Sequence, residues 1–178
     1  MASIFGHALT AVALGSSFKK SLLTWKFWTL GIICSILPDA DVIGFKFGIA
    51  YASFWGHRGF SHSLLFALLL GIIMMMLFYR KRTRLEKTML AFYFTLSTAS
   101  HSVLDALTSG GLGVAFFAPW SNTRYFFPWR PIKVSPIGID SFFSERGQQV
   151  LLNEVIWIGI PCLGVIAISI LLKNISLK

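Results

Sequence analysis

Five apolar runs, separated by short polar and basic segments, most strongly limit what this chain can fold into. They cover residues 2–15, 22–37, 64–79, 88–108 and 150–172. The third run, together with its flanks, approaches the ~20 residues that a helix needs to cross a bilayer. With 55% hydrophobic and 13% charged residues, the chain is far more apolar than a soluble domain, where about 25% of residues are charged. We therefore expect residues 1–178 to form a single all-α domain, an integral membrane bundle of about four to five hydrophobic helices.

The net charge of +9 is distributed in the way expected of a multi-pass protein of the cytoplasmic (inner) membrane. Basic residues fall between the apolar runs and form no stripe with interleaved aromatics, so we predict membrane lipids as partners and no nucleic acid. If the runs alternate, Lys19, Lys20, the cluster at 80–87 and Lys173 share the cytoplasmic side. The aspartates and histidines then face away from the cytoplasm. Basic residues in the opposite loops, such as Arg130, weaken this orientation.

Two segments outside the apolar runs are predicted to lie at the membrane surface. Residues 42–59 mix glycines and aromatics and are typical of a loop or an interfacial segment. Residues 112–149 form a long extramembrane loop rich in Phe, Trp and Pro, which suits the headgroup zone and is expected to shape a groove for acyl chains. Cys34 and Cys162 lie in apolar runs and make no CxxC pair, so we expect buried apolar residues and no disulfide.

All four histidines lie next to, or in step with, another potential metal ligand. Ionisable side chains near membrane depth are costly and are therefore functional candidates. Imidazole plus carboxylate is a ligand set that zinc or manganese accepts. His101 and Asp105 are spaced i, i+4, so they project from one face of the fourth predicted helix. The alternative is that Asp105 only orients His101 or caps a helix end.

Two further segments carry polar candidates beside the apolar runs. Asp39 and Asp41 follow Pro38 and can reach one cation or bridge two, although Pro-Asp is also a plain turn and cap signal. Residues 57–63 (HRGFSHS) form the densest polar cluster. Its Arg58 suits a two-point grip on a phosphate; the alternative is an arginine that reaches lipid headgroups from an interfacial loop.

These segments resemble one family. They are Gly6-His7, Leu37-Pro38-Asp39-Ala40-Asp41, the run from His57 to Ser63, the run from His101 to Thr108, and Phe117 to Ser121 followed by Arg124-Tyr125. In order and rough spacing over residues 3–130 they resemble the YdjM-like membrane-bound metal-dependent hydrolases, some of which are LexA-regulated. Ser102 departs from the pattern, because a proline often follows this histidine in the family. Its absence predicts a straighter helix.

The resemblance implies an integral membrane protein with a divalent metal site and a distant kinship with zinc-dependent phospholipase C and P1-type nuclease folds. The ligands that it implies are His7, Asp39, His62, His101 and Asp105, with Asp41 bridging two ions or supporting a ligand. The metal is expected to be zinc, or alternatively manganese, as one or two ions.

We therefore predict a membrane-bound hydrolase that cleaves a phosphoester in a phospholipid or another lipid-linked substrate by means of a metal-activated water. Arg58 is expected to bind the phosphate, and Asp41 or His57 to act as general base. The alternatives are a non-enzymatic carrier or sensor of divalent metal and a structural membrane protein that binds none. A transporter usually has polar residues through the whole membrane thickness, whereas here they gather at one side.

Overall fold

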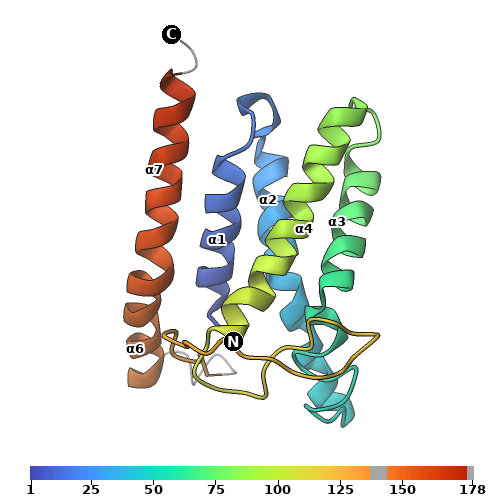
Figure 1. Cartoon of the computed structure of the whole chain (residues 1–178), viewed down its shortest axis with the longest axis vertical. Coiled ribbons are helices and arrows are strands. Elements are labelled where there is room, and N and C mark those ends of the chain that lie inside the picture. Colours follow the sequence, from blue (N-terminus) through green and yellow to red (C-terminus); the bar gives the residue numbers. More distant parts are fainter. Residues whose placement is uncertain (137–143, 176–178) are drawn as a thin grey trace.

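The helices of this protein stand side by side, with the long connecting loop gathered at one end of the bundle (Figure 1). The computed structural model describes residues 1–136 and 144–175. The elements of the bundle are α1 (Ile4–Ser16), α2 (Trp25–Ile36), α3 (Leu64–Phe78), α4 (Arg84–Ala106), α6 (Glu145–Glu154), the π-helical η4 (Val155–Gly159) and α7 (Ile160–Ile175). Short 3-10 helices are η1 (Lys20–Leu22), η2 (Leu37–Phe47) and η3 (Phe60–His62). The described residues contain two isolated β-bridges and no named strand, so the all-α prediction is confirmed.

The helices begin where the sequence supplies a capping side chain. Five residues each accept a hydrogen bond from the backbone N–H three positions further on: Ser3, Thr24, Ser63, Thr83 and Ser144. At Thr83 the Glu86 carboxylate also accepts from the Thr83 N–H, which completes a capping box. α4 therefore begins at Arg84 and not at position 88, and α2 begins after Thr24 and not at position 22.

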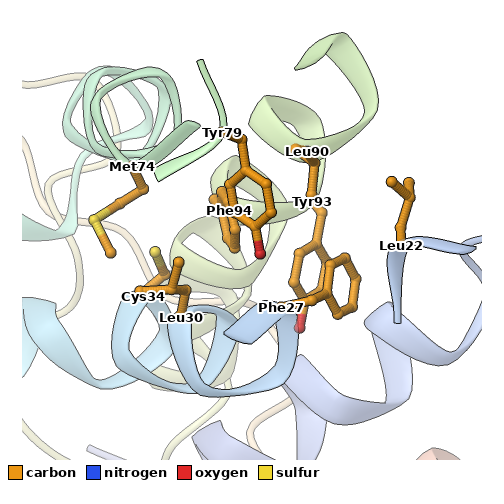
Figure 2. Close-up of a cluster of buried hydrophobic side chains, with 9 residues drawn as sticks. All are labelled: Leu22, Phe27, Leu30, Cys34, Met74, Tyr79, Leu90, Tyr93 and Phe94. Carbon is orange, nitrogen blue, oxygen red and sulfur yellow. The ribbon is translucent and has the colours of Figure 1, made fainter. Parts of the chain in front are cut away.

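The main apolar core lies where α2, α3 and α4 face one another (Figure 2). The rings of Phe27 and Tyr93 stack with centroids 4.0 Å apart, and the Tyr93 hydroxyl donates to the Ala11 carbonyl at 3.2 Å. α1, α2 and α4 therefore meet at Tyr93. Gly31 lies against this ring, and any Cβ at that position would collide with it. Cys34 belongs to this cluster, and both cysteines are buried and free, as predicted.

One continuous helix among the described residues is long and apolar enough to cross a membrane, Glu145–Ile175. α1 and α3 are apolar but have 13 and 15 residues. At about 1.5 Å per residue they rise roughly 20 Å, less than a hydrocarbon core of about 30 Å. Helix length and composition thus support one spanning helix directly, and a bundle of four to five spans stays a prediction.

The two connections predicted at the membrane surface lie at the same end of the bundle (Figure 1). α2 ends at Ile36, just before Pro38, in agreement with the predicted end of the second run. The chain then continues as the 3-10 helix η2 to Phe47, where a loop or interfacial segment was expected from position 42. Residues 107–136 run as a loop with exposed aromatic side chains: Phe117, Trp120, Tyr125, Phe127 and Trp129. The last helix begins at Glu145, so the predicted loop ends before position 149. Its part at 137–143 lies outside the described residues.

Candidate metal centre

Four potential ligands from three elements meet at the loop end of the bundle. Asp39 comes from η2, His62 from η3, and His101 and Asp105 from α4; one ligand atom of each lies within 4.8 Å of the others. The Nε2 atoms of His62 and His101 are 3.0 Å apart, and Asp39 Oδ1 lies 3.3 Å from His101 Nε2. Nitrogen and oxygen ligands bound to one zinc ion at about 2.1 Å are roughly 3.0–3.4 Å from each other. These distances therefore suit a shared ion.

His7 adds a fifth side chain to this cluster from α1. Its ring stacks on that of His101 with centroids 3.7 Å apart, and its Nε2 lies 3.6 Å from Asp105 Oδ1. Both nitrogens of His7 and Oδ1 of Asp39 are buried and have no hydrogen-bond partner among the described residues. A buried polar atom without a partner costs about 1–3 kcal/mol. Unpaired nitrogen and oxygen atoms at this point fit the donor set of a divalent metal.

The hydrogen bonds behind the two facing histidines fix which nitrogen carries the proton. His101 Nδ1 donates to the Ser35 carbonyl at 2.7 Å, because a carbonyl oxygen only accepts. His62 Nδ1 faces the Ser61 hydroxyl at 3.0 Å and Asp41 Oδ2 at 3.2 Å. If both rings are neutral, each carries its single proton on Nδ1, so both Nε2 atoms are unprotonated. Two unprotonated nitrogens that face each other repel, and a positive charge between them removes this repulsion. A proton or a metal ion satisfies this requirement.

The charge balance of the site also favours a cation. Three buried or nearly buried carboxylates (Asp39, Asp41 and Asp105) face two cations, the guanidinium group of Arg58 and the N-terminal ammonium of Met1, which lies 3.9 Å from Asp105 Oδ1. One negative charge is left in excess when the histidines are neutral. Burial alone lowers the pKa of His62, but the carboxylates of Asp39 and Asp41 raise it above its ordinary value. The surroundings of His62 therefore stabilise positive charge.

Asp41 lies behind His62 and organises the turn that carries it. Its Oδ1 pairs with His57 Nδ1 at 2.7 Å, and its Oδ2 accepts from the Ser61 hydroxyl at 2.5 Å and the Arg58 N–H at 3.2 Å. Burial acts to raise the pKa of Asp41, but the hydrogen bonds and charge of His57 and His62 hold it below its usual range. Asp41, His57 and His62 form a second group that could hold a metal. Of the two predicted roles of Asp41, these contacts favour support of His62 over bridging.

Arg58 is placed differently from the role predicted for it. It is buried, its φ of 63° is in the left-handed region that side chains rarely adopt, and its guanidinium group is occupied by the protein. Nε donates to Asp105 Oδ2 at 2.9 Å, Nη2 to the Thr108 hydroxyl at 3.0 Å and Nη1 to the Gly110 carbonyl at 2.8 Å. A contact with phosphate would require it to leave these partners and stays a prediction.

Several supporting residues were not predicted from the sequence. The Ser102 hydroxyl donates to the His62 carbonyl at 2.7 Å, a bond that proline would not make, and α4 continues unbroken through it. Arg124 donates to the carbonyls of His57, Tyr51 and Ser53. In the sequence, Arg124 stands out only through its place in the family motif, shortly after Ser121. Glu154 accepts from the N–H and hydroxyl of Ser3, a contact without any local sequence signal.

The fold and the site define an α-helical protein with a buried histidine–aspartate cluster at one end of its bundle. The chain belongs to the family described as YdjM inner membrane protein, which it matches over residues 1–175. It is 37% identical over 161 residues to the inner membrane protein YbcI of Escherichia coli (strain K12), covering 90% of this chain and 92% of that protein. It is 32% identical over 93 residues to YvsG of Bacillus subtilis (strain 168), covering 48% of this chain and 54% of that protein. No solved structure matches the chain.

The family resemblance predicted from the sequence motifs is thereby confirmed. The matching family and YbcI are both described as inner membrane proteins, in agreement with the predicted location. The distant kinship with phospholipase C and P1-type nuclease folds stays a prediction.

Proposed function

We propose that this protein is a membrane-bound, metal-dependent hydrolase that cleaves a phosphoester in a phospholipid or another lipid-linked substrate. The observation that carries the proposal is the buried cluster of Asp39, His62, His101 and Asp105, with its facing Nε2 atoms and unpaired ligand atoms. The donor set suits zinc, or alternatively manganese. When bound, such an ion would lower the pKa of a water and polarise a phosphoryl oxygen.

The side chains around the cluster have separate roles in this proposal. His7, Asp39, His62, His101 and Asp105 would hold one or two ions. Arg58 is a positioning residue, because its guanidinium group fixes the carboxylate of Asp105. The His57 ring is the candidate proton acceptor, since its contact with Asp41 at 2.7 Å fixes the orientation of the imidazole.

A cavity of about 390 Å³ beside the site supports a lipid-like substrate. Asp41 and Ser61 supply its polar wall, and both contact His62. The rest of its described wall is largely apolar: Gly44, Ile49, Trp55, Phe60 and Phe66. Such a mixed wall suits a ligand with a polar head and an acyl chain. These residues come from the segment between α2 and α3 and from the start of α3, whereas the acyl-chain groove was predicted at the aromatic loop 112–149.

We further infer a multi-pass arrangement with the metal centre on the side away from the cytoplasm. Exposed apolar side chains cover α3 and the last helix, among them Leu68, Leu69, Leu163 and Leu171. Basic connections lie at the end of the bundle opposite the metal centre (Figure 1). Basic connections of this kind favour the cytoplasmic side.

Non-enzymatic metal binding, in a carrier or a sensor, is a second candidate function. The observation in its favour is burial: His7, His62, His101 and Asp105 are at most 1% exposed. A catalytic zinc site keeps an open position for substrate, whereas a closed site only holds the metal. Asp39, with a side chain 13% exposed, is the point at which the cluster comes closest to an opening.

The two candidates are separated by an activity screen. Protein purified in detergent, stripped of metal and reloaded with zinc or manganese, is offered phospholipids and other lipid phosphoesters. We expect metal-dependent turnover that is lost in Asp39→Asn. If no lipid phosphoester is turned over while metal stays bound and the helical content is intact, the carrier or sensor function is favoured.

A further inference from the structure

A cavity of about 820 Å³ lies at the end of the bundle opposite the metal centre. One wall is the start of α2, with Thr24, Trp25 and Lys26. The other wall is the end of α3 and the turn into α4, residues 77–82. This cavity therefore belongs to neither the metal centre nor the apolar cavity beside it.

The lining of this cavity is strongly basic. Four cations face it: Lys26, Arg80, Lys81 and Arg82. Among these four, in the described part of the chain, only Arg82 has an acidic partner, with Nη1 3.3 Å from Glu86 Oε1. Three positive charges are therefore left without a carboxylate.

Two of these cations are held in place by neutral acceptors. Lys26 Nζ donates to the Phe78 carbonyl at 3.0 Å and lies over the Phe78 and Tyr79 rings at 5.1 and 5.2 Å. Arg80 Nε donates to the Met76 carbonyl at 3.0 Å. Such contacts orient a cation without neutralising it, so the site is prepared for an anion from outside the chain.

Backbone donors add to the charge. α2, with 12 residues, begins at Trp25, so its first free N–H groups lie at the same wall as Lys26 and carry the partial positive charge of a helix N-terminus. These N–H groups favour a ligand rich in acceptor oxygens.

The remaining lining is apolar and exposed, which indicates what carries the anion. Trp25, Leu77 and Phe78 are 80%, 57% and 41% exposed at the end of the bundle. Aromatic and basic residues side by side are typical of the headgroup depth of a membrane. Basic pockets between membrane helices on the cytoplasmic side bind the headgroups of anionic lipids.

We propose that the cavity between the start of α2 and the α3–α4 turn binds the headgroup of an anionic phospholipid, with the phosphate on Lys26, Arg80 and Lys81 and the chains along Leu77 and Phe78. The site is separate from the proposed hydrolysis, and its lipid is a bound partner and not the substrate. The site is lined by both the start of α2 and the end of α3, so its ligand would contact both helices.

The test measures thermal stabilisation of the full chain in detergent by dioctanoyl phosphatidylglycerol, with dioctanoyl phosphatidylcholine and glycerol phosphate as comparison ligands. We expect stabilisation by phosphatidylglycerol alone. Arg80→Gln with Lys81→Gln should raise the half-maximal lipid concentration by about tenfold. The matched control is Lys19→Gln with Lys20→Gln, which removes the same charge from exposed positions at the same end but outside the cavity, and it should change that concentration by less than about twofold.

Three results would overturn the proposal. Equal stabilisation by the two lipids would show that the anionic headgroup is not recognised. An equal loss of stabilisation by phosphatidylglycerol in both double variants would show that only general surface charge matters. Full stabilisation by glycerol phosphate would identify a soluble anion as the ligand. Because Arg80 and Lys81 are exposed, the double variant Arg80→Gln with Lys81→Gln should fold. If it does not, Lys81→Gln alone should still raise the half-maximal lipid concentration by about threefold.

Discussion

The guanidinium group of Arg58 and the carboxylate of Asp105 form an ion pair in which neither side chain is exposed, with Nε 2.9 Å from Oδ2. The other oxygen of Asp105 accepts from the Ala2 N–H at 2.9 Å and lies 3.6 Å from His7 Nε2. The pair therefore joins the turn before η3, the end of α4 and the start of α1. Arg58 also fixes the position of Asp105 Oδ2, the oxygen that lies 3.7 Å from His62 Nε2.

Replacing Arg58 by alanine should strongly destabilise the metal-free protein, because Asp105 would be left buried without its partner. Removal of one member of a buried pair costs about 3–5 kcal/mol. Arg58→Lys should restore only part of this, since an ammonium group does not hold Asp105, Thr108 and Gly110 together as the guanidinium fork does. The melting temperature in detergent measures the effect, with the exposed Arg130→Ala as control. An unchanged melting temperature in Arg58→Ala would contradict the assigned role.

The purified protein should contain a divalent metal held by the cluster. His101→Ala and Asp105→Ala should each lower the metal content by at least about tenfold. Loss of a residue that only supports a ligand already costs about tenfold or more in metal affinity, and loss of a ligand itself should cost no less. Ser100→Ala is the matched control, because it lies beside His101 on α4 and its hydroxyl donates to the Ser97 carbonyl at 2.8 Å, its one partner within the described part of the chain. Elemental analysis of the three variants and the unaltered protein decides this. The same metal content in all four would exclude the cluster as the metal site.

Much of this centre could be predicted from patterns local to each segment. The i, i+4 spacing of His101 and Asp105 predicts a common helical face, and both side chains do turn toward Asp39 and His62. Alternation of the apolar runs predicts that their segments share one side of the molecule. The bundle satisfies this expectation, since η2, η3 and the end of α4 meet there.

The contacts that hold the centre in place depend on chain paths that local patterns do not contain. Arg58 reaches Thr108 and Gly110 because the loop after α4 bends back at Gly111, whose φ is 91° and whose Cβ, if present, would lie 2.6 Å from Arg58 Nη1. The start of α4 is a different case. Thr83 and Glu86 have capping-box spacing in the sequence, but the apolar run from which the helix was predicted begins only at position 88.

Asp41→Asn should weaken metal binding without removing a ligand from the main cluster. The amide presents a donor to His57 Nδ1 or to the Ser61 hydroxyl and no longer stabilises the protonated Nδ1 of His62. Loss of such a supporting carboxylate typically costs 10–100-fold in metal affinity, so we expect about that range. Competition with a chromophoric zinc chelator measures it. Ser61→Ala removes a neutral hydroxyl that contacts both His62 and Asp41 but leaves the carboxylate in place, so it should have a smaller effect. An Asp41→Asn affinity equal to that of the unaltered protein would refute the supporting role.

Glu154 should hold the last helix against the start of α1. Its carboxylate accepts from the N–H and the hydroxyl of Ser3, and it is 5% exposed. Glu154→Ala leaves the Ser3 N–H without its acceptor, a loss of about 1–3 kcal/mol. We expect faster hydrogen exchange in the first turn of α1, measured by mass spectrometry, and no change in the exposed control Ile156→Ala. Equal exchange in both variants would show that packing alone docks this helix.

The orientation in the membrane should place the metal centre away from the cytoplasm. Single cysteines at Lys81 and Asn122, in a chain without Cys34 and Cys162, report the two ends of the bundle, and both positions are exposed. Because basic connections stay on the cytoplasmic side, an impermeant thiol reagent added to intact spheroplasts should label Asn122→Cys and spare Lys81→Cys. Labelling of both after the membrane is disrupted serves as the control for reactivity. The reverse pattern in intact spheroplasts would place the metal centre in the cytoplasm.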